Sequence, residues 1–397
     1  IAAQIAEPQE RTQRLNAARQ AFDRIGQQYA TSPQAPVATL ERANCMVAAN
    51  DVNGAINELN KFKADPFKQA PVAPLAYLRM GALLRSQNKA TEAAAALQEG
   101  RTNYENALMN DPTRAAWAPL LQYHHGLAIK DLARKDPAKL DVAKLNEART
   151  LFDNLKQRFP NSPQAADAGW RSGQCRREEH TPRLIAARAI LLRTDAKPEE
   201  ITAATTQLAD AVKQLTETAQ YFVAQAGLAA QLKLAGTEVH QQLLYDAAWC
   251  YQWVADIEID AARKKMVDEA MKKAAEEAAK QPAGLKGVVN MRIPEFAAAV
   301  IPVQPSEKLA RDQYAALIAA RPESPLSINA RLELAEMQSR RDEVDPAIAL
   351  LNDALTQEPA ADVEERLRMR LGVCLVAKKD FAAAFAQYSA VAANATS

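Results

Sequence analysis

One spacing recurs along the chain: a small residue, an apolar residue four positions later, another three positions on, and a proline five positions further. The clearest copies are Ala148, Phe152, Leu155 and Pro160; Ala310, Tyr314, Leu317 and Pro322; and Ala347, Leu351, Ala354 and Pro359. Steps of three and four place side chains on one face of a helix, and proline ends a helix. A small residue allows two helices to approach closely, and the bulky residue a turn later fills the gap. The spacing therefore predicts helices that stack side by side.

A second pattern precedes several of these copies, in which a small residue lies two positions before a cysteine. It occurs at Ala43 and Cys45, Gly173 and Cys175, Ala248 and Cys250, and Gly372 and Cys374. In the cleanest copies the small residue of the first helix lies twelve positions before the small residue of the second, as at Ala43 and Ala55, Ala335 and Ala347, and Gly372 and Ala384. The repeated unit is therefore predicted to be a pair of helices.

Composition agrees with a helical chain that buries a core. Hydrophobic residues make up 48% of the 397 residues, and 12 glycines are few for a β-rich fold with many turns. The net charge of +1 lacks the basic excess typical of nucleic-acid binders. No apolar run approaches the ~20 residues of a membrane span. The sequence starts at Ile1 and not at Met, so either a targeting segment was removed or the chain was trimmed.

The two patterns together resemble the tetratricopeptide (TPR) repeat. The first helix contains the small residue, the second reads Ala-x3-aromatic-x2-Ala, and a proline closes the unit. The resemblance covers most of residues 10–178 and 306–397 and is strongest over 148–178 and 325–397, although the Trp and Leu typical of the family's first helix are usually missing. It implies an all-α, TPR-like α-solenoid of antiparallel helix pairs.

Several linkers read Ser-Pro ahead of a predicted helix, at Ser32, Ser162 and Ser324. Serine is a good N-cap residue, and proline suits the first helical position because its missing N–H would have no partner there. The linker from Phe159 to Pro163 resembles that of bacterial cell-envelope TPR proteins such as the TolA-binding protein and the lipoprotein BamD. This resemblance implies the periplasm or cell envelope of a bacterium rather than the cytoplasm.

Residues 179–305 interrupt the repeats. No proline occurs between Pro198 and Pro282, and this stretch is rich in strong helix formers. We therefore expect a long inserted helical hairpin that protrudes, with helices over 198–234 and 237–281 and a charged, solvated far end. An irregular, partly extended return is expected over 283–305, with Ser306 capping the next helix. The predicted parts are an N-terminal TPR-like array over 1–178, the hairpin insertion over 179–305 and C-terminal TPR repeats over 306–397.

No pattern predicts catalysis, a metal or a cofactor. The four cysteines occupy equivalent places in different repeats, where helices ~8–10 Å apart are too distant for a disulfide, so we expect them to pack as small apolar residues. The adjacent His124 and His125 point to different faces of a helix. Nucleotide-binding and hydrolase motifs are missing from the sequence. We therefore predict a protein that is not an enzyme.

The TPR resemblance implies that the first helix of each repeat lines a concave groove. It places in that groove Tyr123, Trp170, Gln174, Arg177, Tyr245, Trp249, Gln252 and Trp253. Aromatic rings beside polar groups suit peptide recognition. The alternative is that the rings pack against the long hairpin, because large aromatic side chains are usually buried.

Two functional hypotheses follow. The first is a non-catalytic scaffold that binds a peptide or protein partner on the concave face of the solenoid. The second is a structural segment of a larger cell-envelope or self-assembling scaffold. Self-association would then use the C-terminal end, where no polar capping helix follows the last repeat.

Overall fold

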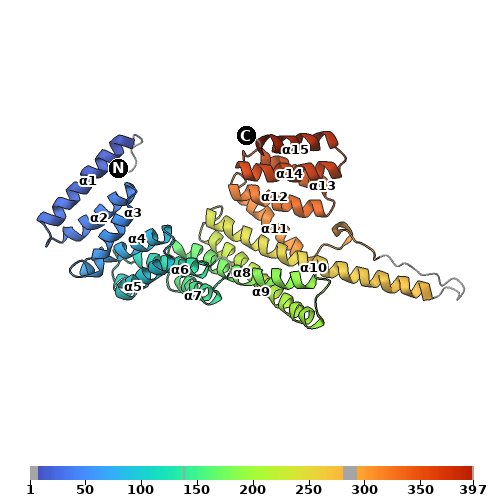
Figure 1. The fold of residues 1–397 in the computed structure, drawn as a ribbon, viewed down its shortest axis with the longest axis horizontal. Coiled ribbons are helices and arrows are strands. Elements are labelled where there is room, and N and C mark those ends of the chain that lie inside the picture. The colour runs from blue at the N-terminus through green and yellow to red at the C-terminus, as the bar shows by residue number, and fades with distance from the viewer. Residues whose placement is uncertain (1–7, 137–138, 280–292, 396–397) are drawn as a thin grey trace. The chain divides into compact units, whose positions relative to one another are not determined.

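The computed structural model describes residues 8–136, 139–279 and 293–395, and every regular element in those ranges is a helix (Figure 1). The chain forms two compact units, the first ending at Cys175 and the second beginning at Arg176. The predicted all-α, TPR-like solenoid with a long helical hairpin is confirmed. The predicted division of the chain into three parts, with boundaries at residues 178 and 305, stays a prediction.

In the first unit, successive helices pack as antiparallel neighbours. They are α1 (Pro8–Gln28), α2 (Gln34–Ala48), α3 (Val52–Leu59), α4 (Ala73–Ser86), α5 (Ala90–Met109), α6 (Trp117–Ala133), α7 (Val142–Arg158) and the first part of α8 (Gln164–Leu191), with short 3-10 helices η2 (Asn60–Lys63) and η3 (Phe67–Gln69). The first helices of consecutive pairs, α4 and α6, also contact each other. They therefore line the inner side of this unit.

The second unit continues the same alternation. It contains the rest of α8, then α9 (Pro198–Gln231), α10 (Glu238–Ala279), η5 (Ala298–Val300), α11 (Pro305–Ala320), α12 (Pro325–Arg340), α13 (Val344–Leu355), α14 (Ala361–Ala377) and α15 (Phe381–Ala395). The first helices α10, α12 and α14 contact one another in order, so they line the inner side here.

The recurrent spacing marks the core of each unit. The side chains of these positions are fully buried, including Ala148, Phe152, Leu155, Ala310, Tyr314, Leu317, Ala347, Leu351 and Ala354. At Gly126 of α6, an added Cβ would lie 2.7 Å from the Cε1 atom of Phe152 on α7. The small residue of the first helix thus makes room for the bulky residue of the second. The sequence interpretation named Ala148 as the small residue that accompanies Phe152, so Gly126 is a second small residue that it did not identify.

Helices α9 and α10 form the long hairpin, and their bounds lie within a few residues of those predicted. Helix α10 packs against both α9 and α11, so part of the hairpin belongs to the stack. Lys264 and Lys265 near its far end are exposed, as expected for a solvated charged region. The predicted irregular return over 283–305 lies partly outside the described residues. From residue 293 to 304 its only helical turn is η5.

Two predicted caps had different outcomes. Ser324 accepts a hydrogen bond from the backbone N–H of Ser327 at 3.1 Å, with Pro325 as the first residue of α12, as predicted. The predicted cap at Ser306 is wrong, because α11 begins one residue earlier, at Pro305. The Ser306 hydroxyl instead donates to Glu258 of α10 at 2.8 Å.

All four cysteines are free thiols, and three of them are buried. Burial raises the pKa of the Cys250 thiol far above its usual range, which keeps it protonated and apolar in character. The expectation that these residues pack as small apolar side chains is confirmed at Cys175, Cys250 and Cys374. Among the described helices, none combines the length and apolar character needed to cross a membrane.

Candidate functional site

Three of the predicted groove residues gather in the first unit around Arg171. The guanidinium of Arg171 lies 4.0 Å from the ring centre of Trp170 and donates to Gln174 Oε1 at 3.2 Å. It also reaches the hydroxyl of Tyr123 at 3.4 Å. Buried Lys130 donates to the same Gln174 oxygen at 2.6 Å. Tyr123, Trp170 and Gln174 are therefore half-buried members of one cluster, which Arg171 and Lys130 complete.

The other five predicted residues lie in the second unit, on α8 and α10. The rings of Trp249 and Trp253 are 5.6 Å apart, as expected for residues four positions apart on one helix face. Arg177 of α8 places its guanidinium 4.9 Å from the ring centre of Trp249 and forms an ion pair with buried Asp246. This cation–π contact fixes the Trp249 ring against α8.

Tyr245 and Gln252 connect this cluster to the following helices. The Tyr245 ring lies 5.8 Å from that of Tyr314 on α11, and burial raises the pKa of Tyr245 to about 12. Gln252 accepts a hydrogen bond from the Tyr314 hydroxyl at 2.7 Å and donates to Glu333 of α12 at 3.2 Å. All five predicted residues are half-buried, so each ring keeps part of its surface in solvent.

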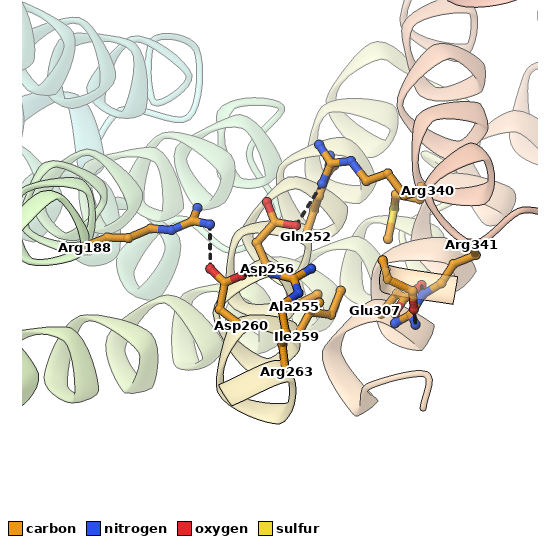
Figure 2. A pocket seen from close by; sticks show the side chains of 12 residues that line it. Arg188, Gln252, Ala255, Asp256, Ile259, Asp260, Arg263, Glu307, Arg340 and Arg341 are labelled. Carbon is orange, nitrogen blue, oxygen red and sulfur yellow. Dashed lines mark hydrogen bonds and ion pairs between the residues drawn. The ribbon is translucent and has the colours of Figure 1, made fainter. Parts of the chain in front are cut away.

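A cavity of about 470 Å³ adjoins the aromatic cluster on the inner side of the second unit (Figure 2). Helix α10 lines the cavity with residues of one helix face, because steps of three and four positions along a helix return to the same face. These are Gln252, Asp256, Ile259, Asp260 and Arg263. Arg188 of α8, Glu307 of α11 and Arg340 of α12 line the other sides. Gln252 belongs to both features, and we call the aromatic cluster and the cavity together the groove along α10.

The charged side chains of the cavity are paired with one another. Arg188 contacts Asp260 at 2.6 Å, and Arg263 contacts the same carboxylate at 2.8 Å. Arg340 contacts Asp256 at 3.0 Å. Figure 2 shows the pair of Arg188 with Asp260 and the pair of Arg340 with Asp256. Burial raises the pKa of Asp256 above its usual range, although the arginines oppose this effect.

Similar ion pairs continue across α12 to α14. Glu336 contacts Arg340 and Arg370, both at 2.9 Å, and Glu333 contacts Arg366 at 3.6 Å. The inner side of the second unit is therefore crossed by charges of alternating sign. Some pairs join neighbouring first helices, and others, such as Glu336 with Arg340, lie within one helix. We call this set of ion pairs the inner ion-pair ladder. Its members are Arg188, Asp256, Asp260, Arg263, Glu333, Glu336, Arg340, Arg366 and Arg370.

A buried arginine holds one wall of the cavity. Arg341, 8% exposed, forms a two-contact ion pair with Glu307, which is 2% exposed. The same guanidinium donates to the backbone carbonyls of Ala298 and Ile301 in the segment that precedes α11. Arg311 adds a contact to Glu307 at 3.0 Å. This network fixes the segment that lines the cavity.

The sequence interpretation missed the charged residues of the cavity. Asp256 and Asp260 lie four and eight positions after Gln252, so the face of α10 could have been extended to them. Their partners Arg340 and Arg188 lie 84 and 72 positions away, and no local pattern joins them. Within the described residues, no three His, Cys, Asp or Glu side chains are grouped so as to hold a metal ion.

Comparison with known families matches residues 2–114 to a tetratricopeptide repeat-like domain. Over these residues the chain resembles the TPR family. A comparison with curated proteins finds no match. The second unit, which lies outside the matched residues, also consists of helix pairs.

Three solved structures align with most of this chain at low identity. A tetratricopeptide repeat protein from Parabacteroides merdae is 10% identical, with 86% of this chain and 99% of that chain covered and a TM-score of 0.31. The human IFIT1 dimer with m7Gppp-AAAA is 11% identical, with 96% and 81% covered and a TM-score of 0.26. Yeast Tom70 is 12% identical, with 96% and 92% covered and a TM-score of 0.20. The resemblance to the TPR family therefore rests on the match over residues 2–114 and on the helix pairs of the chain, and not on these structures.

Proposed function

We propose that this protein is a non-catalytic scaffold that binds a protein or peptide partner in the groove along α10. The observation that carries the proposal is the continuity of the aromatic cluster and the cavity through Gln252. The non-catalytic part of the proposal is supported by the repeat class, whose extended inner surfaces generally serve binding. Protein is preferred to nucleic acid because the groove's arginines are paired with carboxylates.

The dimensions of the groove suit an extended peptide. A cavity of about 470 Å³ falls within the ~300–1,000 Å³ range typical of ligand pockets. Trp249 and Asp260 are eleven positions apart on α10, or ~16 Å along the helix axis. An extended peptide of about five residues covers that length. One end of such a peptide would contact aromatic rings and the other end paired charges.

Replacing Trp249 with alanine is expected to reduce partner capture about tenfold, because a tryptophan ring that a partner covers is a typical binding hot spot. The measurement is quantitative cross-linking mass spectrometry on extract from the source cells, using the purified protein as bait. Tyr29→Ala, at an exposed aromatic residue directly after α1, is the matched control and should capture the same partner at the original level. Equal capture by the two variants, with both folded by circular dichroism, would rule out the groove.

A second candidate function is a self-assembling scaffold, and an exposed apolar surface on α14 and α15 favours it. Phe381 and Phe385 of α15 are 64% and 73% exposed. The corresponding residues of α13, Val344 and Ile348, are half-buried against the core of the second unit. The exposure of such apolar rings to water is unfavourable unless another surface covers them.

Light scattering separates the two candidates. For a self-assembling scaffold, the molar mass of the protein should rise with concentration, and Phe385→Glu should restore the mass of one chain. A constant monomer mass across the concentration range would exclude assembly through this surface.

We also propose that the protein works in the periplasm or cell envelope of a bacterium. The support is the likeness of the linker from Phe159 to Pro163 to those of envelope TPR proteins. Fractionation of the source cells tests it, and recovery of the protein in the cytoplasmic fraction alone would refute it.

A further inference from the structure

The adjacent histidines of α6 have no part in the proposed function, yet both lie in the packed interior of the first unit. His125 is 5% exposed and His124 is half-buried. They point to different faces of α6, which packs against α4, α5 and α7. Each ring lies near an arginine of a different neighbour, His125 near Arg101 of α5 and His124 near Arg85 of α4.

The contact between Arg101 and His125 requires a neutral histidine. A guanidinium has only donors, so Arg101 donates to Nδ1 of His125 across their 3.1 Å contact. The Nδ1 atom has a lone pair to accept this bond only when the ring carries a single proton, on Nε2. Among the described residues, the buried Nε2 atom has no hydrogen-bond partner. A second proton would therefore remove the acceptor for Arg101 and place two positive charges side by side.

The charges around His125 do not compensate a second proton. Those that face the ring from α5 and α7 are Arg101, Glu105, Lys144 and Glu147. Each carboxylate is already engaged by a cation of its own helix, Glu105 by Arg101 and Glu147 by Lys144, both at 2.7 Å. Burial and the Arg101 guanidinium lower the pKa of His125 to about 4, and the carboxylates oppose them only in part.

His124 meets the same conditions on the other face of α6. Burial and the charge of Arg85 lower its pKa, and Arg85 is itself paired with Asp131 of α6 at 2.5 Å. The Nδ1 atom of His124 is buried and has no hydrogen-bond partner among the described residues. Its ring lies 5.7 Å from that of Tyr123, whose hydroxyl is 3.4 Å from Arg171 of α8.

We infer that His124 and His125 make the packing of α6 acid-sensitive, so that proton uptake by the two rings separates this helix from α4 and α5. A protonated His125 must leave Arg101 and reach water, and it can do so only when the helices part. Tyr123 lies on the same helix, so acid would also disturb the cluster around Arg171. This inference does not depend on partner binding along α10.

The pH range of the effect follows from the two states of His125. The ordinary pKa of histidine is 6.5, and the packed helix lowers it to about 4. The opened helix therefore binds more protons than the packed one, so the contribution to stability is complete above about pH 6.5 and is lost as the pH falls towards 4. From pH 7 to pH 5, this one ring multiplies the opening constant about twentyfold. Most carboxylates titrate below this range.

Two measurements on the intact chain test the inference. Hydrogen exchange of the α6 amides at pH 7 and pH 5, corrected for the intrinsic exchange rates, should show at least about tenfold less protection at pH 5. The NMR signal of the His125 ring, followed from pH 7.5 downwards, should show no protonation of the packed helix above about pH 5.

A matched set of variants assigns the effect to the two rings. Glutamine can accept a bond from arginine but takes up no proton. In the double variant His124→Gln/His125→Gln, the α6 amides should have the same protection at pH 5 as at pH 7, to within about twofold. The control is His240→Gln, at a histidine of α10 that is 9% exposed, and it should leave the acid response of α6 unchanged. Circular dichroism at pH 7.5 checks the fold of both variants.

Three results would overturn the inference. They are titration of the packed His125 near pH 6.5, equal protection of α6 at pH 7 and pH 5, and an acid response that persists in the double glutamine variant. The first two come from the original protein, so they decide the matter even if the double variant does not fold. None of these results would bear on the effect of Trp249→Ala on partner capture.

Discussion

Replacing Arg341 with alanine should lower the free energy of unfolding of the second unit by about 3–5 kcal/mol. The substitution leaves the Glu307 carboxylate buried without its main partner and removes the hydrogen bonds to the Ala298 and Ile301 carbonyls. Uncompensated buried charges are among the most destabilising changes known in proteins. Chemical denaturation monitored by circular dichroism measures the loss.

An exposed arginine of the same unit provides the control. Arg321 contacts Glu323 at 3.0 Å, but both side chains are more than half exposed. Surface pairs contribute about 0–1 kcal/mol, so Arg321→Ala should change the stability very little. Hydrogen exchange adds a local measurement, because in Arg341→Ala the amides of residues 296–301 should exchange faster. If the two arginine variants were equally stable, the buried network would not hold the cavity wall.

Two glycines of the first unit should respond to alanine in opposite directions. Gly126→Ala places a methyl group 2.7 Å from the buried Phe152 ring, and overpacking of this kind costs about 1–3 kcal/mol. At Gly26 of α1 nothing lies within 4 Å of an added Cβ. There alanine should stabilise by up to about 1 kcal/mol, because glycine loses more backbone freedom in a helix.

Denaturant unfolding of both variants beside the original protein checks the sign of each change. The comparison separates close packing from helix propensity, since both substitutions improve propensity. Stabilisation by Gly126→Ala would show that the small residue of the first helix is not required for the approach of α6 to α7.

The helical array was predictable because its signal is local. The residues at Ala148, Phe152 and Leu155 lie within two turns of one helix, and their spacing alone places them on a buried face. The lengths of α9 and α10 were predictable for a similar reason, since no proline interrupts them. Sequence reasoning therefore identified which face of each helix is buried.

The contents of the groove were only partly predictable. The TPR register selected Trp249 and Gln252, which are three positions apart on α10, and their role in binding a partner stays a prediction. Which charges meet across the helices depends on how each helix is rotated and shifted against the next. Ser306 illustrates this, because it bonds to Glu258, 48 positions earlier, and does not cap its own helix.

The inner ion-pair ladder has a consequence for any partner of the second unit. An acidic ligand that engages Arg340 must compete with Asp256 and Glu336, which already hold that guanidinium. Recognition would then be an exchange of one carboxylate for another, with little net gain from each contact. Such a surface discriminates by shape and by the placement of groups, and it releases its guest readily.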